Sequence, residues 1–300
     1  MSGNDLKLSV IIVSVNGLSF IGESLESLSQ QSCRDEIEVI LVDRCGDSVR
    51  NFVGQRYPWI KLIEASPETT IPKLRALAFR ETSGEIIAVL EDHCIVEPDW
   101  ARSMIEAHQS EYSVIGGSIE NAACGKIVDW AAFFCDYSQA IKPLPEGEAN
   151  ILPGNNVSYK RLVIERFRDV IEAGVWDYTL HEHIKNAGII LYSIPSITVH
   201  HKMSASLVWF ISQRYHLARS FAGMRFTNSS GFQRVLYGAG SVVLPVILAK
   251  RIVTSVWKKG KHRRELFLSL PFLVLLLVSW GIGELFGYIL GPGISTSKVS

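Results

Sequence analysis

The segment from Glu91 to His93 holds two carboxylates and one imidazole in consecutive positions. These groups can bind a divalent cation, and imidazole suits Mn²⁺ better than Mg²⁺. Five apolar residues, Ile86 to Leu90, come directly before them. A short apolar run is typical of a strand buried on both faces of a parallel sheet, and ligands of such sheets bind at the carboxyl ends of the strands. The segment therefore predicts a ligand site, with a solvated acidic turn as the alternative.

The elements that must position this segment alternate between strand and helix. The apolar runs 8–13, 37–42 and 59–63 predict strands, and the first two end in Ser14 and Asp43. Helical patterns follow them, and Pro72 suits the first turn of a helix that extends to about residue 82. This alternation predicts a parallel sheet with right-handed crossovers, which gathers the polar strand ends at one edge.

The pattern loosens beyond residue 113. The sequence there predicts strands and helices without a regular alternation, the strands at 114–119, 157–159, 189–193 and 197–201 and the helices at 161–168 and 179–186. No internal repeat is apparent.

The composition excludes some classes of protein. Thirty basic residues balance 30 acidic residues, so no global field favours nucleic acid, and we expect no nucleic-acid partner. The five cysteines are scattered and lack metal-site spacing, which favours a reducing compartment and argues against a disulfide framework or a zinc site. The apolar run 8–13 is too short for a signal sequence, so we expect the catalytic part to stay in the cytoplasm.

The C-terminal part of the chain contains two apolar segments. Residues 235–249 are apolar or small but short for a bilayer span. Residues 266–283 carry no charge, and 285–290 extend them past Glu284, which meets the length of a span of roughly 17–25 residues. A buried core helix is the alternative interpretation.

A basic cluster within residues 250–264 separates the two segments and contains no acid. Because Lys and Arg beside a span prefer the cytoplasmic side, both ends of 235–249 would lie on that side, and this segment should lie in the interface. We therefore predict a single span near 266–290 at the cytoplasmic face of the inner membrane, with the cluster near anionic lipids. The predicted organisation is a catalytic domain at 1–230 and membrane-associating helices at 231–300, with a basic linker at 250–264.

Several motifs together resemble family 2 glycosyltransferases over roughly residues 6–225. They are Val13-Ser-Val-Asn16, Val42-Asp43, Leu74-Arg75 before Ser83-Gly84-Glu85, Leu90-Glu-Asp-His93 with Glu97-Pro-Asp-Trp100, Gly154-Asn155-Asn156, Trp176-Asp177 with Leu180 and Ala187-Gly188, and Val199-His200. The resemblance implies a GT-A fold, a Rossmann-like mixed α/β sheet, here followed by interfacial or transmembrane helices. It also implies a nucleotide-diphosphate sugar as the donor.

The resemblance implies a donor site at the ends of the first strands. Ser14 and Asn16 would line the base pocket, and Asp43 matches the acid that binds the nucleobase. A helix cap is the alternative for Asp43. Arg75 matches an arginine that can face the diphosphate with its fork of donors.

The resemblance also implies a metal site. Asp92 would serve the ribose or the metal and His93 would be a direct ligand, whereas Glu91 occupies a less constrained position. Histidine replaces the usual aspartate at 93, so we expect Mn²⁺ more than Mg²⁺. Adjacent strand residues face opposite ways, so only one of His200 and His201 should complete the site, and His200 is the better match.

The catalytic base implied by the family is Asp177, which would take the acceptor hydroxyl's proton in an inverting transfer. Glu182 is the nearest rival but falls at a helical position that the family does not use. Asn155 and Asn156 would contact the sugar, and a role in a turn is the alternative.

The resemblance favours a non-processive, inverting transfer to a lipid-linked or cell-envelope glycan acceptor at a membrane. Processive members carry Gln-x-x-Arg-Trp, whereas this chain reads Gln213-Arg-Tyr-His-Leu217. The alternative function is a catalytically silent scaffold that binds nucleotide sugar, which Arg44, His93 and Trp176 favour because they replace usual family residues. A homo-oligomer stays open, and no Gly-x-Gly-x-x-Gly follows the first strand to indicate a dehydrogenase.

Overall fold

A computed structural model describes residues 6–225 and 230–299. The chain forms two compact units. The first takes in the chain up to Glu120 and Ala140–Lys202, and the second takes in Asn121–Gln139 and the chain from Met203 onward. The predicted domain boundary at 230 adjoins residues 226–229, which lie outside the described residues, and the division between the units falls earlier, at 202.

The first unit contains a mixed sheet, which has nine strands among the described residues and the order β3-β2-β1-β4-β8-β6-β9-β5, with β7 paired to β9. The strands are β1 Leu8–Ser14, β2 Ile37–Asp43, β3 Lys61–Glu64, β4 Ile86–Glu91, β5 Cys94–Val96, β6 Val114–Asn121, β7 Gly147–Glu148, β8 Val157–Lys160 and β9 Leu191–His201. The predicted mixed α/β sheet is confirmed.

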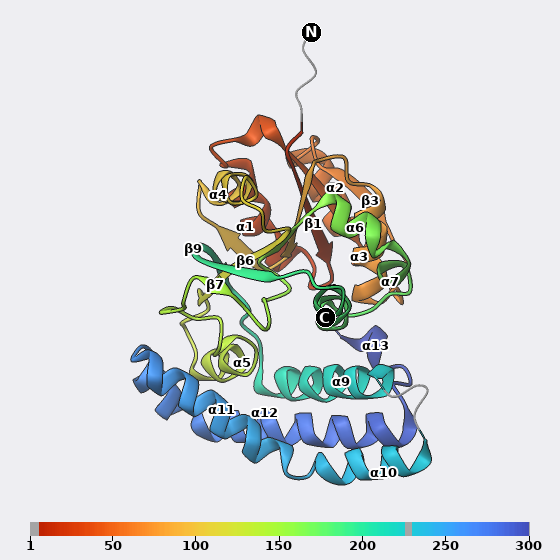
Figure 1. Cartoon of the computed structure of the whole chain (residues 1–300), viewed down its shortest axis with the longest axis vertical. Helices are drawn as coiled ribbons and strands as arrows, with labels where there is room; N and C mark the ends of the chain where they lie inside the picture. The colour runs from red at the N-terminus through yellow and green to blue at the C-terminus, as the bar shows by residue number, and fades with distance from the viewer. Residues whose placement is uncertain (1–5, 226–229, 300) are drawn as a thin grey trace. The chain divides into compact units, whose positions relative to one another are not determined.

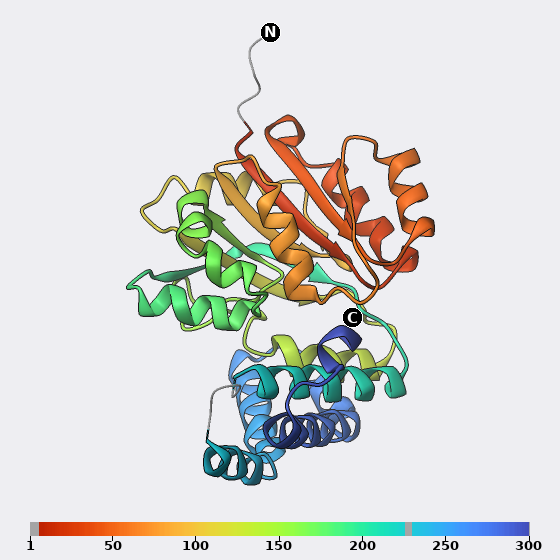
Figure 2. The same ribbon diagram turned by 90° about the vertical axis from the view of Figure 1, so that its right-hand side faces the viewer.

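Four parallel strands, β1 to β4, form the part of the sheet that the sequence predicted best. β1 pairs in parallel with β2 on one side and with β4 on the other, and all seven residues of β1 are buried. Helices cover these strands, as the apolar character of both strand faces requires. They are α1 Leu18–Ser29, α2 Asp47–Arg56, α3 Ile71–Arg80 and α4 Trp100–Ala107, with a 3₁₀ turn at Arg34–Glu36. Figure 2 shows α3, in orange, in front of the parallel strands.

The other strands of the sheet run antiparallel to their neighbours. β8 pairs with β4 and β6, and β5 and β7 pair with β9. The predicted strands 189–193 and 197–201 are one continuous strand, β9. Gly117 in β6 allows a close approach to β9, because a Cβ there would lie 1.8 Å from the Ile197 carbonyl oxygen. The helices of this part are α6 Arg161–Arg166, α7 Arg168–Glu172 and α8 Asp177–Asn186.

The second unit consists mainly of helices in the part that the structure describes. Its helices are α5 Ile127–Tyr137, α9 Leu207–Arg225, α10 Gly231–Gly240, α11 Leu244–Lys259, α12 Arg263–Leu290 and α13 Ser295–Lys298. α12 packs against α5, α9, α10 and α11 and lies between α9 and α10 (Figure 1). The helix α5 was not predicted, because residues 127–137 are apolar on most positions and give no clear period.

The predicted span at 266–290 falls within α12, which is long and apolar enough to cross a membrane. The predicted interfacial segment 235–249 divides between α10 and α11, which meet at a bend of 51° and together could form a second, broken span. Length and composition alone support these assignments. The predicted basic linker is largely helical, because its residues 250–259 form the last ten residues of α11.

Candidate donor and metal site

The candidate site lies where the parallel sheet changes direction. From β1 the chain continues to β2 and β3 on one side of the sheet, and it then returns to β4 on the other side of β1. Such a reversal leaves a crevice outside the carboxyl ends of the two central strands, where ligands of open α/β sheets bind. Val13 pairs with Glu91 at these ends, so the residues that follow both strands meet there.

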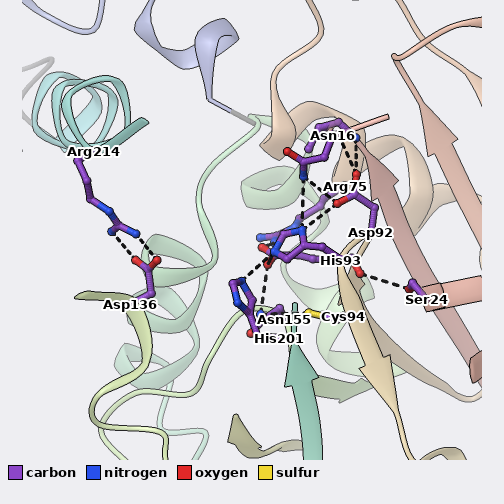
Figure 3. A network of polar contacts seen from close by, with 12 residues as sticks. Asn16, Ser24, Arg75, Asp92, His93, Cys94, Asp136, Asn155, His201 and Arg214 are labelled. Carbon is purple, nitrogen blue, oxygen red and sulfur yellow. Dashed lines mark hydrogen bonds and ion pairs between the residues drawn. The ribbon is translucent and has the colours of Figure 1, made fainter. Parts of the chain in front are cut away.

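Three possible metal ligands converge at this place. One ligand atom each from Glu91, His93 and His201 lies within 4.8 Å of the others. The two Nε2 atoms of His93 and His201 are 2.8 Å apart, and Glu91 Oε2 is 3.4 Å from His93 Nε2 (Figure 3). Both imidazoles are buried. The antiparallel pairing of Cys94 with His201 brings β9 to this edge.

Asp92 contacts the side of the His93 ring that faces away from His201 and Glu91 and so orients it. Its Oδ1 lies 2.9 Å from His93 Nδ1 and accepts a hydrogen bond from Asn16 Nδ2, while its Oδ2 accepts from the backbone N–H groups of Val15 and Asn16. This contact occupies Nδ1 of His93 and leaves Nε2 facing His201 and Glu91. Metal-binding histidines commonly have such a carboxylate behind them, because it fixes the ring and the tautomer. Asp92 therefore turns toward the loop after β1, and the adjacent Glu91 faces the histidines.

The two carboxylates differ in their electrostatic setting. Burial alone would raise the pKa of Asp92, but hydrogen bonds from His93, Asn16 and Val15 outweigh it and hold this pKa below its usual range. Partial burial raises the pKa of Glu91, despite the opposing charges of His93 and Arg75. A cation bound beside Glu91 would lower this pKa again, because it would favour the charged carboxylate.

The donor set fits a divalent transition metal. Two imidazoles and one carboxylate are ligands that such ions accept, and the carboxylate behind His93 completes the outer arrangement. Asn155 donates from Nδ2 to Glu91 Oε2 at 3.2 Å and so holds the third ligand in place. The residues present are therefore compatible with the metal that the fold family implies.

Asp177 lies in the first turn of α8, beside this cluster. Arg75 joins the two, because its Nη1 pairs with Asp177 Oδ1 and its Nη2 lies 3.2 Å from Glu91 Oε1. Arg75 is buried, whereas about 28% of the Asp177 side chain is exposed. Both residues line one cleft with Gly154 and Tyr159. Asp177 thus combines a fixed position with access from solvent, as a general base requires.

Buried contacts anchor α8 beneath Asp177. His181, one turn later, lies with its Nε2 2.8 Å from the hydroxyl of Tyr159 on β8. Burial lowers the pKa of His181 to about 4, so its imidazole is neutral at pH 7. Glu182, the predicted rival base, is exposed on the outer side of the helix. Only Asp177 of these two carboxylates lines the cleft.

Gly154 provides the space that the Asp177 carboxylate occupies. A Cβ at position 154 would lie 1.7 Å from Asp177 Oδ2, so Gly154→Ala must displace the carboxylate. We expect this variant to fold and to lose most of its sugar-transfer rate, measured as kcat with saturating donor. The control is Gly54→Ala on α2, where a Cβ would meet nothing within 4 Å. Equal rates for both variants would contradict a catalytic position for Asp177.

The other predicted donor residues lie at the ends of β1 and β2. The Ser14 hydroxyl contacts Cys45 Sγ at 3.6 Å. Asp43 accepts hydrogen bonds from the backbone N–H groups of Cys45 and Gly46, at 3.1 and 3.0 Å, and it pairs with Arg50 at 3.1 Å. These contacts stabilise the turn before α2 and occupy both oxygens of Asp43, whereas the N-cap of α2 is Gly46.

The adjacent residues Asn155 and Asn156, both predicted to contact the sugar, point in different directions. Asn155 contacts Glu91, but Asn156 is fully buried and bonds to Trp100 Nε1 and to the carbonyl oxygens of Ser118 and Ile197. Asn156 therefore ties strands together and does not face the cluster.

The two histidines at the end of β9 also separate. His200 Nε2 lies 2.9 Å from Glu97 Oε1, and its side chain is partly exposed, whereas His201 is buried against His93. As expected for neighbours on a strand, the two side chains face opposite ways. The structure brings His201, and not the predicted His200, into the cluster.

The sequence interpretation also underrated Glu91. Residues 92 and 93 form the turn between β4 and β5, so strand alternation gave no signal for choosing Glu91 over Asp92. No signal distinguished His201 either, because the choice depends on which face of β9 meets β5.

Comparisons with known proteins agree with this geometry. The sequence model described as "Glycosyl transferase family 2" matches residues 9–166. No curated protein sequence matches the chain. The chain is therefore compared with the family model and with solved structures.

Two of the similar solved structures come from different organisms. One is the mannosyltransferase PcManGT from Pyrobaculum calidifontis in complex with GDP-Man and Mn²⁺, with 16% identity, a TM-score of 0.58 and coverage of 93% of this chain and 87% of that chain. The other is S. aureus TarS 1-349, with 15% identity, a TM-score of 0.52 and coverage of 93% and 90%. TarS in complex with UDP-GlcNAc has a TM-score of 0.51, with 15% identity and the same coverage. At these identities the likeness to the solved structures concerns the fold alone. The family model matches more than half of the residues of this chain, so the chain belongs to glycosyl transferase family 2 and is a glycosyltransferase with a GT-A fold.

Proposed function

We propose that this enzyme transfers a sugar from a nucleotide-diphosphate sugar to a hydroxyl of a lipid-linked or cell-envelope glycan, in one inverting step for each encounter. One observation carries the proposal. Arg75 links Glu91 of the candidate metal cluster to Asp177 of the cleft, so the groups for the leaving diphosphate and for the attacking hydroxyl lie side by side. An in-line displacement needs both groups close to the same anomeric carbon.

Glu91, His93 and His201 would hold the metal, with Asp92 positioning His93. When bound, a divalent metal neutralises the charge that develops on the nucleoside diphosphate as the glycosidic bond breaks. We propose Mn²⁺ over Mg²⁺ because two of the three ligands are imidazoles. The presence of Mn²⁺ with GDP-Man in the similar mannosyltransferase supports this choice.

Asp177 would take the proton of the acceptor hydroxyl through its exposed carboxylate. Arg75 would donate hydrogen bonds to the diphosphate of the donor. Because its two Nη atoms contact Glu91 and Asp177, the same guanidinium would also hold the base next to the donor. Ser14 and Asn16, at the end of β1, would line the donor pocket. The backbone turn that Asp43 holds would shape the same pocket from β2.

The acceptor proposal rests on the second unit. α12 is an apolar helix of span length, and the basic residues of 250–264 lie at its start, which supports attachment to a membrane where lipid-linked acceptors occur. The Gln-x-x-Arg-Trp signature of processive members is replaced here. Arg214 of the replacing segment is buried in a salt bridge with Asp136 and cannot contact a glycan.

A panel of UDP-, GDP- and dTDP-sugars tests the donor class. We expect one nucleotide sugar to raise the thermal unfolding temperature of the full chain only when Mn²⁺ is present, and to be turned over by the same preparation. Mg²⁺ at equal concentration is the matched condition, and we expect a smaller shift. Binding of a nucleotide sugar without hydrolysis or transfer to any acceptor would favour a silent scaffold instead.

A further inference from the structure

We propose that the helical unit lies in the plane of one membrane leaflet, with α12 parallel to the bilayer surface instead of crossing it. The inference rests on the proposed membrane attachment and specifies how that attachment is made. It also replaces the predicted span at 266–290 with an in-plane helix. The lipid surface that fits is one rich in anionic headgroups.

The first observation is the long contact between α12 and α9. The Ser279 hydroxyl donates to the Ile211 carbonyl oxygen at 2.7 Å. Further along, a Cβ at Gly283 would lie 2.4 Å from the Tyr215 carbonyl oxygen, and one at Gly287 would lie 2.6 Å from that of Arg219. These contacts recur every four residues on both helices, so α9 and α12 run side by side in the same direction (Figure 1).

The second observation is that α9 carries charge at the middle of the predicted span. Arg214 is buried in a salt bridge with Asp136 of α5, and its guanidinium carbon lies 6.0 Å from the ring of Trp280 on α12. Trp280 is near the centre of 266–290. If α12 crossed the bilayer, this ion pair would reach the hydrocarbon core.

A crossing α12 would also carry further polar groups of α9 toward the far side of the bilayer. Arg219 donates from Nε to the Gly291 carbonyl oxygen at 3.1 Å, and His216 lies 3.1 Å from the Ser295 hydroxyl. Placing charged and ionisable groups inside a membrane costs free energy. An in-plane α12 keeps α9 and its charges on the water side.

The third observation is a flank of α12 that is exposed and apolar. Phe267, Val274, Val278, Ile282 and Phe286 are exposed and recur at helical spacing along the whole helix. α10 and the first half of α11 add exposed Val235, Leu236, Val246 and Ile247. An exposed apolar surface of this extent marks a membrane or protein contact.

The charges beside this apolar surface indicate lipid. Lys258, Lys261 and Arg264 are exposed at the turn between α11 and α12. Trp257, also exposed, lies beneath Arg263 at 4.7 Å from its guanidinium carbon. Basic residues and an amphipathic aromatic ring beside an apolar face are typical of helices in the membrane interface, where they contact anionic headgroups.

Labelling distinguishes an in-plane helix from a crossing one. The full chain carries Cys124→Ser, which removes the exposed cysteine, and a new cysteine before or after α12, Lys261→Cys or Lys298→Cys. Each protein is added to sealed vesicles of phosphatidylcholine with 30% phosphatidylglycerol and treated with a membrane-impermeant maleimide. We expect both positions to react fully without detergent. Protection of Lys298→Cys until detergent is added would show a crossing helix and overturn the proposal.

Charge reversal tests the lipid chemistry. We expect Lys258→Glu, Lys261→Glu and Arg264→Glu together to lower partitioning onto the anionic vesicles by roughly 100-fold or more, since each lost cation alone accounts for about a fivefold decrease. The control reverses three exposed cations of the first unit, Arg166, Arg168 and Lys185, with the same change in net charge. Equal losses in both triple variants would contradict the assigned surface.

The two proposals fail in different ways. A chain that does not float with vesicles in a density gradient, and that sediments as a dimer, would place a second copy on the apolar face and overturn the in-plane proposal. Sugar transfer by the full chain in detergent is a separate measurement, because the proposed catalytic and metal-binding residues lie in the first unit. Flotation with loss of all turnover would instead contradict the proposed catalysis.

Discussion

Asp177→Asn should lower the rate of sugar transfer by about 10²–10⁴-fold, the usual contribution of a positioned general base. The carboxamide keeps the size of the side chain but cannot take a proton from the acceptor hydroxyl. Binding of the donor with Mn²⁺ should persist, because Asp177 is outside the cluster of Glu91, His93 and His201. The measurement is kcat for transfer, with the donor affinity determined separately by calorimetry.

Glu182→Gln is the matched control for this substitution. Glu182 lies on the same helix as Asp177, and its side chain is exposed instead of lining the cleft. We expect its kcat to equal that of the unaltered enzyme. If Glu182→Gln reduced transfer as strongly as Asp177→Asn, or if Asp177→Asn kept full activity, the assignment of the base would be wrong.

His201→Ala should weaken Mn²⁺ binding by more than about 100-fold. Loss of a residue that only supports a metal ligand lowers affinity by about 10–100-fold, and His201 is itself a proposed ligand. The substitution removes one of the two imidazoles whose Nε2 atoms are 2.8 Å apart. Mn²⁺ affinity can be measured directly by electron paramagnetic resonance of the free ion, without any substrate. This readout separates metal binding from catalysis.

His200→Ala is an unusually close control, because the residue is the direct neighbour of His201 on β9. Its imidazole pairs with Glu97 at 2.9 Å and faces away from the cluster. We expect Mn²⁺ affinity within about twofold of the unaltered enzyme, since removal of an exposed partner has little energetic effect. The reverse order of the two effects would restore His200 as the ligand and reject the arrangement of the cluster.

The parts of the fold that the sequence predicted are those in which local pattern and tertiary environment agree. The runs that became β1, β2 and β4 are mostly apolar because helices cover these strands, so their boundaries follow closely from composition. β9 was divided in two because Pro195 and Ser196 interrupt its apolar pattern, yet the strand continues through them. The antiparallel order of β8, β6 and β9 has no local signal, because it depends on long-range pairing.

The candidate site shows the same limit at the level of single residues. Asp177 and Arg75 could be placed from their motifs, but their contact with each other joins residues 102 positions apart. The roles of Glu91 and Asp92 could not be assigned from their order in the chain. Asp92 turns away because the backbone N–H groups of Val15 and Asn16 need an acceptor, and this need is invisible without the neighbouring loop.

The interleaved path of the chain has a consequence for expression of a catalytic fragment. α5 is inserted between strands of the sheet, at 121–139, yet it packs on α12 near the end of the chain. A fragment that stops at residue 230 would retain α5 and α9 and lose the helix that covers both. The surfaces of α5 and α9 that α12 covers would become exposed, so such a truncation would aggregate more readily than the full chain. The helical tail is therefore a structural partner of two earlier segments, and removing it does not release an independent enzyme.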